Sequence, residues 1–343
     1  MLVKQDGSVW SSGVNSDGRS NKFVQVIPSG ATAAAVGIDY SMVLKQDGSV
    51  WTAGKNTAGQ LGDGTTADRA TFFCLQMIPA AKAVAAGGYH SLILTQDGFI
   101  WAAGCNKHGQ LGDGSRDNKR IFFQVSISDE SLAVDAAAGD DHSMVVMQDG
   151  SVWSAGWNDN GQLGDGSTTD RITFVKVMSS GAANVAAGGY HTMVLMQDGS
   201  VWITGCNEYG QLGDGSTTDR SSYAPVVSSG AKAIAAGSRH TMMLKQHGSV
   251  WATGYNIYGQ LGDGSTINSQ VFVEVLSGGV KGIAAGAFHS MVLKQDGSFW
   301  ATGSNQYGQF GDGSTWSQKI FVRLAPFGNG NTQHDHTHMD PPS

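Results

Sequence analysis

Short apolar runs separated by glycine-rich turns extend along the whole chain and return about every 49 residues. Each run has the length of a β-strand. The turns between the second and third runs mostly read Q-D-G, and the Asp-Gly pair is typical of hairpin turns. We name the four runs of one unit strands A to D and expect them to form one antiparallel sheet. In the unit at 231–279 they occupy 231–236, 240–245, 249–253 and 271–276.

Three phrases recur in register and establish the repeat, which must be recognised before any fold is assigned. The phrase G-Q-L-G-D-G occurs five times, and Phe310 replaces its leucine in a sixth copy. The phrase A-A-G-x-x-H-[ST] occurs five times, and a degraded copy at 36–41 has Tyr40 in the place of the histidine. The phrase D-G-S-V-W or a close variant occurs seven times, with tryptophans at Trp10, Trp51, Trp101, Trp153, Trp202, Trp251 and Trp300.

A single sheet of this kind cannot bury both of its faces, whereas radially stacked sheets bury them against each other. Small residues at the end of strand A, such as Ala235 and Gly237, suit the crowded axis, and Trp251 and Phe272 suit the wider space outside it. Helical repeats are excluded because no apolar 3.6-residue period is sustained, and solenoid β-repeats are shorter. We predict an all-β, seven-bladed β-propeller with four-stranded antiparallel blades.

The first blade departs from this pattern. The chain has seven B–C–D units but only six A strands, and residues 1–4 match the middle of strand B, as at 291–294. We therefore predict a three-stranded first blade without the innermost strand, and we leave open whether the ring closes. Residues 325–343 are polar and glycine-rich, so we expect a disordered, histidine-containing tail that supplies no strand. The expected propeller domain is 1–324, with blades at about 1–30, 31–80, 81–130, 131–181, 182–230, 231–279 and 280–324.

The blade phrases resemble those of the regulator of chromosome condensation repeat family over residues 1 to about 324. Its pattern combines A-x-G-x-x-H-[ST], D-G-x-[VIL]-[WY] and G-x-N-x-x-G-Q-L-G-x-G. The resemblance implies a seven-bladed propeller. It does not fix a function, since the family includes an exchange factor for the small GTPase Ran, plant ultraviolet-B photoreceptors and propellers of ubiquitin ligases. In blade five the last phrase is matched by Gly205, Asn207, Gly210, Gln211, Leu212, Gly213 and Gly215.

Two departures from the family bear on these functions. The protruding β-wedge of the exchange factor is not evident, because after the first repeat the tryptophan spacings vary only from 49 to 52 residues. The photoreceptors carry tryptophan in a G-W-R-H-T phrase, and residues 238–241 here keep R-H-T without it, so light sensing is not expected. The positions that correspond to that tryptophan are Tyr89, Asp141, Tyr190, Arg239 and Phe288.

Composition narrows the class of protein. The net charge is −7, and no run of lysine and arginine forms the basic footprint that direct binding to nucleic acid requires. Three scattered cysteines without C-x-x-C do not form a disulfide framework, and no apolar stretch has the length of a membrane span. The N-terminus lacks the apolar region of a signal peptide. We expect a soluble intracellular protein, cytoplasmic or nuclear, although the missing half-repeat leaves a lost leader open; the oligomeric state is also open.

The repeated polar residues have two interpretations each. Aspartates of the G-D-G turns, such as Asp214, either bind cations around a ring or bond to their own turn backbone, and we favour the turn. The repeated histidines either bind a metal or act in catalysis, or they form a hydrogen bond between strands A and B, and we favour the structural bond. The tail histidines His334, His336 and His338 offer a weak metal tract. No catalytic triad, P-loop or zincin motif occurs, so we predict no catalytic residue, no cofactor and no enzyme.

Strand parity places the A–B and C–D loops on one face of the ring, and these loops carry most of the sequence variation. Aromatic residues and arginine are enriched at interface hot spots, so we expect this face to bind a protein, although some of the rings may instead pack between blades. The alternative is regulation or nucleotide exchange of a small GTPase, favoured by an acidic pair on the same face; a propeller enzyme or light sensor is a remote third. The candidate residues are Tyr40, Tyr89, Asp140, Asp141, Trp157, Tyr190, Tyr209, Arg239, Tyr258, Phe288 and Tyr307.

Overall fold

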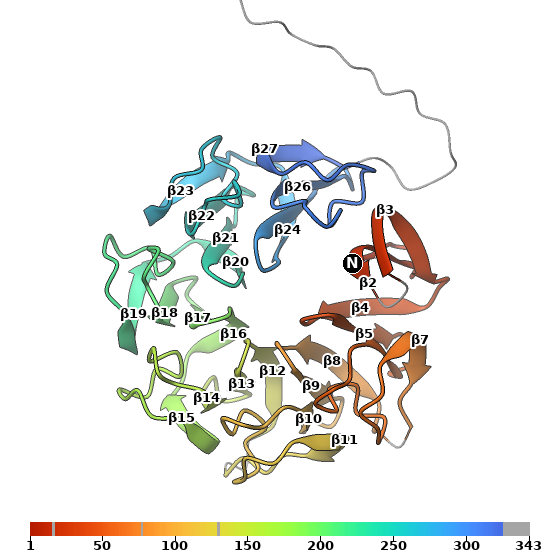
Figure 1. The fold of residues 1–343 in the computed structure, drawn as a ribbon. Coiled ribbons are helices and arrows are strands. Elements are labelled where there is room, and N and C mark those ends of the chain that lie inside the picture. The colour runs from red at the N-terminus through yellow and green to blue at the C-terminus, as the bar shows by residue number, and fades with distance from the viewer. Residues whose placement is uncertain (16–17, 77, 129–130, 325–343) are drawn as a thin grey trace, which may run out of the picture.

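The computed structural model describes residues 1–15, 18–76, 78–128 and 131–324, which form seven antiparallel sheets arranged in a ring (Figure 1). Six sheets have four strands, and within each the strands pair in chain order from the axis outward. The first sheet has three strands, β1 (Leu2–Val3), β2 (Val9–Asn15) and β3 (Gly18–Ile27). The predicted seven-bladed propeller and its three-stranded first blade are confirmed.

The other six blades repeat the same four positions. Strands A are β4 (Ala31–Val36), β8 (Ala81–Ala86), β12 (Ala133–Ala138), β16 (Ala182–Ala187), β20 (Ala231–Ala236) and β24 (Val280–Ala285). Strands B are β5 (Tyr40–Lys45), β9 (His90–Thr95), β13 (His142–Met147), β17 (His191–Met196), β21 (His240–Lys245) and β25 (His289–Lys294). Strands C are β6 (Val50–Gly54), β10 (Ile100–Gly104), β14 (Val152–Gly156), β18 (Val201–Gly205), β22 (Val250–Gly254) and β26 (Phe299–Gly303). Strands D are β7 (Arg69–Cys74), β11 (Lys119–Gln124), β15 (Arg171–Met178), β19 (Arg220–Val227), β23 (Ser269–Leu276) and β27 (Gln318–Arg323).

The B–C hairpin shows why the Q-D-G-S phrase recurs. In blade five Gly199 has φ +78°, which costs glycine little, and the Asp198 carboxylate accepts the Ser200 amide at 2.8 Å. The Ser200 hydroxyl in turn accepts the indole N–H of Trp202 at 3.3 Å. The aspartate and the serine therefore hold the turn and the tryptophan ring that follows it.

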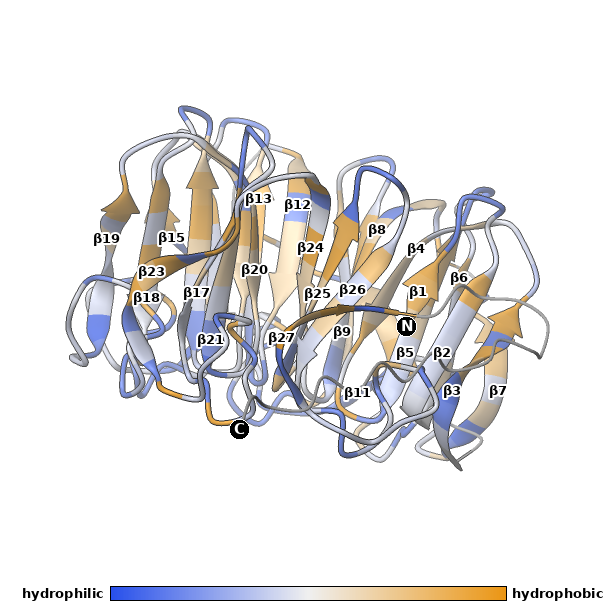
Figure 2. Ribbon diagram, turned by 90° about the horizontal axis from the view of Figure 1, so that it is seen from above, coloured by the Kyte–Doolittle hydropathy of each residue, from blue (hydrophilic) through white to orange (hydrophobic). Residues whose placement is uncertain are grey.

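Apolar side chains of neighbouring blades form the core. Met193 and Ile203 of blade five pack in one buried cluster with Ile234 and Met243 of blade six, and Trp251 packs against it. Figure 2 shows apolar residues concentrated along the strands and polar residues at the two rims. Burial of this surface between sheets drives the blades together, and the loops at the rims are left to carry function.

Each C–D loop also joins its blade to the next one. In blade five the buried Asn207 amide donates to the Asp214 carboxylate at 3.2 Å, and its carbonyl oxygen accepts the Leu212 amide at 3.0 Å. The loop then crosses the seam, because the Gly215 amide donates to the Gln270 carbonyl of blade six at 2.9 Å. The G-x-N-x-x-G-Q-L-G-D-G phrase thus encodes both the loop and the inter-blade contact.

The seam between blades seven and one differs from the others because blade one has no strand A. Leu2 of blade one packs with Met291, Phe310 and Leu324 of blade seven. The expectations for the tail at 325–343, including its three histidines, lie outside the described residues. Within the described part of the chain there is no helix long and apolar enough to cross a membrane.

Candidate functional site

The A–B loops gather around the axis at one end of the ring. Five of them have the sequence G-x-x-H, and in blade two Tyr40 takes the place of the histidine. The first variable residue lines the axial opening, and the second lies farther from it. In blade four these residues are Asp140 and Asp141, and in blade six they are Ser238 and Arg239. One loop therefore presents one side chain to the axis and another to the surrounding rim.

The repeated histidines are buried and connect neighbouring blades. His142 Nε2 lies 2.8 Å from the Thr192 hydroxyl of blade five, and His191 Nε2 lies 2.9 Å from the Thr241 hydroxyl of blade six. The predicted bond between strands A and B of one blade is wrong: the partner is strand B of the next blade. The reason is that the histidine at the start of strand B points across the seam, where the next [ST] residue meets it.

The hydroxyls fix the tautomer of these histidines. Thr192 donates its only hydroxyl proton to the Gln162 carbonyl at 2.8 Å, so its oxygen accepts the N–H of His142 Nε2. The Nδ1 atom of His142 is then unprotonated, and it has no hydrogen-bond partner among the described residues. Burial lowers the pKa of His142 to about 3 and that of His191 to about 4, so both rings are neutral at physiological pH.

Tyr40 does not belong to the exposed rim. It is 2 % exposed, and its hydroxyl donates to the His90 carbonyl of the next blade. Tyr40 occupies the histidine position of its loop, so the ring enters the seam as the histidines do. The rim position of that loop is taken by Asp39, which has φ +60°.

Most of the other predicted aromatic residues meet in a continuous series of contacts that we call the aromatic arc. Trp157 of blade four contacts Tyr190 of blade five edge-on, with ring centroids 5.4 Å apart. The Arg239 guanidinium lies over Tyr190 at 5.6 Å and over Tyr209 at 5.1 Å, and it donates to the Tyr209 hydroxyl at 2.9 Å. Arg239 thus joins the rings of two loops into one surface.

The arc continues into blades six and seven. Tyr209 contacts Tyr255 edge-on at 4.8 Å, and Tyr255 lies 6.1 Å from Phe288. Tyr258 contacts Phe288 at 5.6 Å. The side chains are partly exposed, so the arc offers ring faces and edges to a partner while its members hold each other in place. The aromatic arc consists of His108, Trp157, Tyr190, Tyr209, Arg239, Tyr255, Tyr258 and Phe288.

Sequence reasoning left two arc members out of the candidate set. Tyr255 follows the last glycine of strand C, as Trp157 does in blade four, so the repeat alignment contained the signal. His108 lies 5.8 Å from the Trp157 ring and was passed over as an ordinary loop residue. Tyr89 holds the A–B loop position of Tyr190 in blade three and is 40 % exposed, and Tyr307 holds the C–D loop position of Tyr209 in blade seven and is 48 % exposed.

The acidic pair is divided between the two parts of this face. Asp141 accepts a hydrogen bond from the Gln110 amide at 2.9 Å and lies 3.8 Å from Lys107 Nζ. Asp140 lies at the axis, where burial and the neighbouring Asp141 raise its pKa to about 6 although Arg239 opposes the shift. Two adjacent carboxylates therefore stand in different environments.

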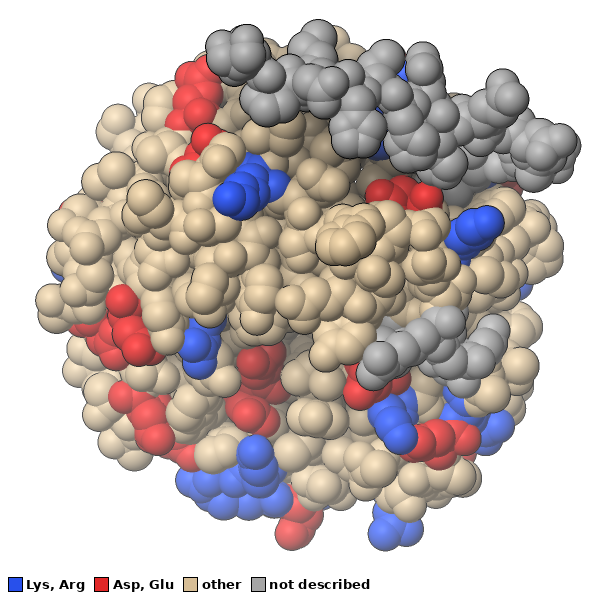
Figure 3. Space-filling model, turned by 45° about the horizontal axis from the view of Figure 1, so that its top comes forward, with Lys and Arg blue, Asp and Glu red and all other residues tan. Residues whose placement is uncertain are grey.

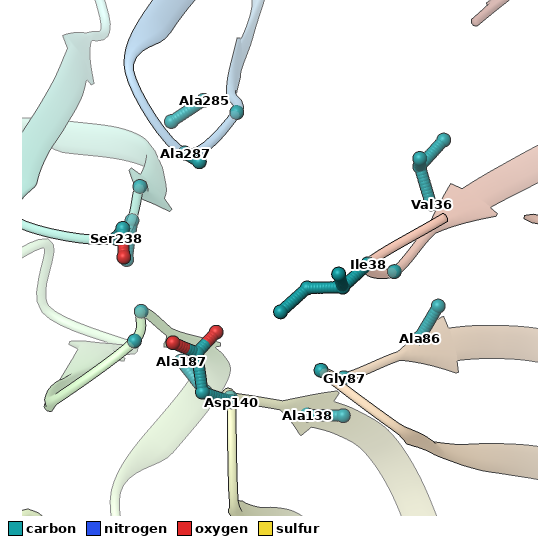
Figure 4. Close-up of a pocket in the computed structure, with 18 residues that line it drawn as sticks. Val36, Ile38, Ala86, Gly87, Ala138, Asp140, Ala187, Ser238, Ala285 and Ala287 are labelled. Carbon is teal, nitrogen blue, oxygen red and sulfur yellow. The ribbon is translucent and has the colours of Figure 1, made fainter. Parts of the chain in front are cut away.

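An axial cavity of about 240 Å³ opens where the strands A end. Its wall consists mainly of glycine and alanine, and Asp140 is its only ionisable lining residue. Figure 4 shows the Asp140 carboxylate and the Ile38 side chain projecting over the opening from different blades, with short side chains around them. In the view of Figure 3, basic and acidic side chains are interspersed over a largely uncharged surface.

The G-D-G aspartates act within their loops. The Asp165 carboxylate accepts the Ser167 amide at 2.9 Å and pairs with Arg171 Nε at 2.6 Å. In blade three Lys119 and the turn hydrogen bonds lower the pKa of Asp113 to about 2, although partial burial opposes this. These bonds support the turn interpretation. Among the described residues, no group of three or more His, Cys, Asp or Glu side chains is arranged to hold a metal ion.

Models of known protein families match the residues that contain these repeats. Residues 1–230 match the family described as the RCC1-like domain, which is more than half of the chain. The chain belongs to the RCC1-like family. The regulator of chromosome condensation (RCC1) repeat also matches at 231–260 and 280–309, and a second form of that repeat matches at 247–293. A search among curated proteins gives no match.

Solved RCC1-like structures share the fold. Human WBSCR16 is 23 % identical and superposes with a TM-score of 0.81 over 90 % of this chain and 85 % of its own. Yeast RCC1 (Prp20), in its complex with Kap60, is 18 % identical with a TM-score of 0.83 over 93 % and 83 %. Prp20p from Saccharomyces cerevisiae, studied for its binding to Gsp1p and histones, is 19 % identical with a TM-score of 0.83 over 93 % and 85 %.

Proposed function

We propose that the chain is a non-catalytic protein-interaction propeller that binds a macromolecular partner through the face formed by its A–B and C–D loops. The aromatic arc is the observation that carries this proposal. Protein interfaces are enriched in tyrosine, tryptophan and arginine, and an anchor whose rotamer is already fixed loses less entropy on binding. Stacking of Arg239 between Tyr190 and Tyr209 provides such an anchor.

The alternative use of these side chains is packing between blades, and their positions argue against it. The residues that fill the seams lie on the strands, as Met193 and Met243 do, and are nearly or fully buried. Tyr190, Tyr209 and Tyr258 lie in loops and keep partial exposure. A role in recognition explains why bulky rings remain at the rim.

The test compares capture of partners by the wild type and by a variant with Tyr190→Ala, Arg239→Ala and Tyr258→Ala. Pull-down from the source cell, followed by mass spectrometry, should recover a specific partner with the wild type and at least tenfold less with the variant. The matched control is Phe99→Ala, since Phe99 is also an exposed aromatic residue but lies in a B–C hairpin at the opposite end of the strands. Equal capture by the triple variant contradicts the proposal.

A second candidate is guanine-nucleotide exchange or another form of regulation of a small GTPase. It is favoured by family membership and by the likeness in fold to Prp20p, whose binding to Gsp1p has been studied. The acidic residues Asp140 and Asp141 on the same face also favour it. Release of mant-GDP from a panel of small GTPases measures it directly. No acceleration at micromolar protein removes this candidate and leaves the binding face in place.

A further inference from the structure

Asp140 and Asp141 are adjacent carboxylates that differ in their partners. The Asp141 carboxylate accepts a hydrogen bond from Gln110 and lies near Lys107. Among the described residues, no side-chain hydrogen bond or ion pair within 4.0 Å reaches the Asp140 carboxylate. A desolvated carboxylate without a partner is costly, and folded proteins ordinarily pair such a charge or expose it to water.

The space around Asp140 is kept free by the residues beside it. A side chain at Gly189 would begin 2.9 Å from the Asp140 Oδ2 atom and 2.8 Å from the Ser238 hydroxyl oxygen. The opening of about 240 Å³ is several times the roughly 30 Å³ share of one water molecule. The carboxylate therefore faces the axial opening, whose walls here are glycine, and the Ser238 side chain is at its edge.

Arg239, which lowers the pKa of Asp140, makes its direct contacts elsewhere. The Arg239 guanidinium acts on Asp140 at a distance, but its direct contacts are the two tyrosine rings and the Tyr209 hydroxyl. Arg239 therefore holds the aromatic arc instead of closing an ion pair at the axis. Among the described residues, the charged groups that shift the pKa of Asp140 are Asp141, which raises it, and Arg239, which lowers it. The other described residues that line the cavity carry no ionisable side chain.

We propose that the axial opening is a receptor for one basic side chain, the ammonium of lysine or the guanidinium of arginine, inserted by the protein partner and paired with Asp140. A cation within hydrogen-bond distance would give the partly buried carboxylate an ion partner, in a charge-assisted contact of the stronger kind. The aromatic arc would anchor the surface around it. This proposal rests on the proposed binding face and specifies what that face recognises at its centre.

The carboxylate must be ionised to pair with a cation, so recognition should depend on pH. The pKa of Asp140 in the free protein is about 6, and below it the neutral acid offers no ion pair. Affinity for a basic side chain should therefore fall as the pH is lowered through this value. Binding of a cation should in turn lower the pKa of Asp140, because each equilibrium favours the charged form.

The test uses Nα-acetyl-lysine methylamide and Nα-acetyl-arginine methylamide as probes, and Nα-acetyl-norleucine methylamide as the uncharged control. At pH 7.5 a basic probe should cause saturable shifts in the NMR amide signals of Gly139, Asp140, Gly188 and Gly189. The Asp140→Asn variant should bind at least tenfold more weakly. The control Asp97→Asn, which removes an exposed carboxylate from a B–C hairpin at the opposite end of the strands, should bind as the wild type does. Between pH 7.5 and pH 5 the wild-type affinity should fall at least tenfold, and the variant should show no such dependence.

Several results overturn the axial receptor: no saturable shifts up to 50 mM of either basic probe, equal shifts with norleucine, unchanged affinity in Asp140→Asn, or shifts confined to other loops. These measurements need no partner protein. Failure of the probes therefore rejects the axial site and leaves the aromatic arc, whereas unchanged capture by the triple arc variant rejects the arc and leaves the axial site.

Discussion

At the scale of single residues, Asp140 is a carboxylate whose ionisation lowers the stability of the folded protein. Burial disfavours its charged form, and Asp141 adds like-charge repulsion. The folded carboxyl ionises at about 6 and the unfolded one near 3.8, so the folded state retains the proton between these values. Stability from this group is complete below about pH 4 and is lost as the pH rises to about 6 and beyond.

Asp140→Asn should therefore stabilise the protein at pH 7.5. Because one pKa unit corresponds to about 1.4 kcal/mol, the gain should be about 1–3 kcal/mol, and it should shrink towards pH 4. Urea unfolding at several pH values measures it. Asp141→Asn is the comparison: it relieves only the like-charge repulsion, which affects the pKa of Asp140 less than burial does, and it weakens the contacts with Gln110 and Lys107, so its gain should be smaller. A variant that is no more stable than the wild type at pH 7.5 contradicts the desolvation of Asp140.

At the scale of elements, the glycine that ends each strand A determines how closely neighbouring blades approach. A Cβ on Gly188 would lie 2.5 Å from the Gly237 carbonyl oxygen of blade six and 2.5 Å from the His191 ring. The requirement at this position is space and not a positive φ. The A-A-G-x-x-H phrase thus brings the blade backbones together beside the histidine that bonds across the seam.

Gly188→Ala should destabilise the propeller by about 1–3 kcal/mol through overpacking, and thermal or urea unfolding measures the loss. Gly282→Ala is the matched control within a strand A, because its nearest neighbour to a new Cβ is 3.7 Å away and Ala233 holds the equivalent place in blade six. That control should be neutral or slightly stabilising. Similar losses of unfolding free energy in both variants would contradict a specific requirement for glycine at position 188.

The C–D loop gives a second prediction at this scale. Asn158 is fully buried, donates to Asp165 at 3.1 Å and accepts the Leu163 amide at 3.0 Å. Asn158→Ala leaves the buried Leu163 amide without its acceptor and removes one of the donors to Asp165, so it should cost about 1–3 kcal/mol in unfolding free energy. Asn160→Ala in the same loop is the control, because Asn160 is partly exposed and its contact with Asp219 is 3.3 Å long. Hydrogen exchange at Leu163 should rise only in Asn158→Ala.

At the scale of the whole molecule, the seam between blades seven and one lacks, in the described part of the chain, a contact that strand A makes at the other six seams. Strand A of each later blade donates to the hairpin before it, as the Val280 amide does to the Gly248 carbonyl at 3.2 Å. Around Gly297 of the last hairpin no described atom lies within 4 Å of a Cβ position, and a cavity of about 620 Å³ opens there. The last histidine bond across a seam in the described residues joins His240 of blade six to the Ser290 hydroxyl of blade seven, and no described hydroxyl of blade one bonds to His289.

An added inner strand should therefore stabilise blade one. Residues 231–241 precede Met242, which holds the register position of Met1, so a copy of A-K-A-I-A-A-G-S-R-H-T fused before Met1 supplies strand A, the glycine and the histidine. The fusion should raise the melting temperature by about 1–3 °C, as a gain of about 1–2 kcal/mol would do in a domain of this size. A scrambled extension of the same composition is the control. Equal melting temperatures for the two fusions would contradict the prediction.

The local pattern was sufficient for most of the architecture. Strands 231–236 and 240–245 were predicted with the bounds of β20 and β21, whereas strand D begins at Ser269 instead of Val271. Alternation of apolar runs with Asp-Gly turns is a short-range property, and repetition then leaves radial stacking as the way to bury both sheet faces. The three-stranded first blade followed from counting the same phrases.

The sequence by itself therefore determined the repeat, the blade and the face on which variable loops gather. Only the tertiary structure decided that Tyr40 is buried, that the histidines bond across seams, that Tyr255 joins the arc, and that Asp140 is unpaired while Asp141 is not. Each of these depends on side chains about 30 to 50 positions apart that neighbouring blades bring into contact. A repeat pattern describes one blade, and such contacts arise only between blades.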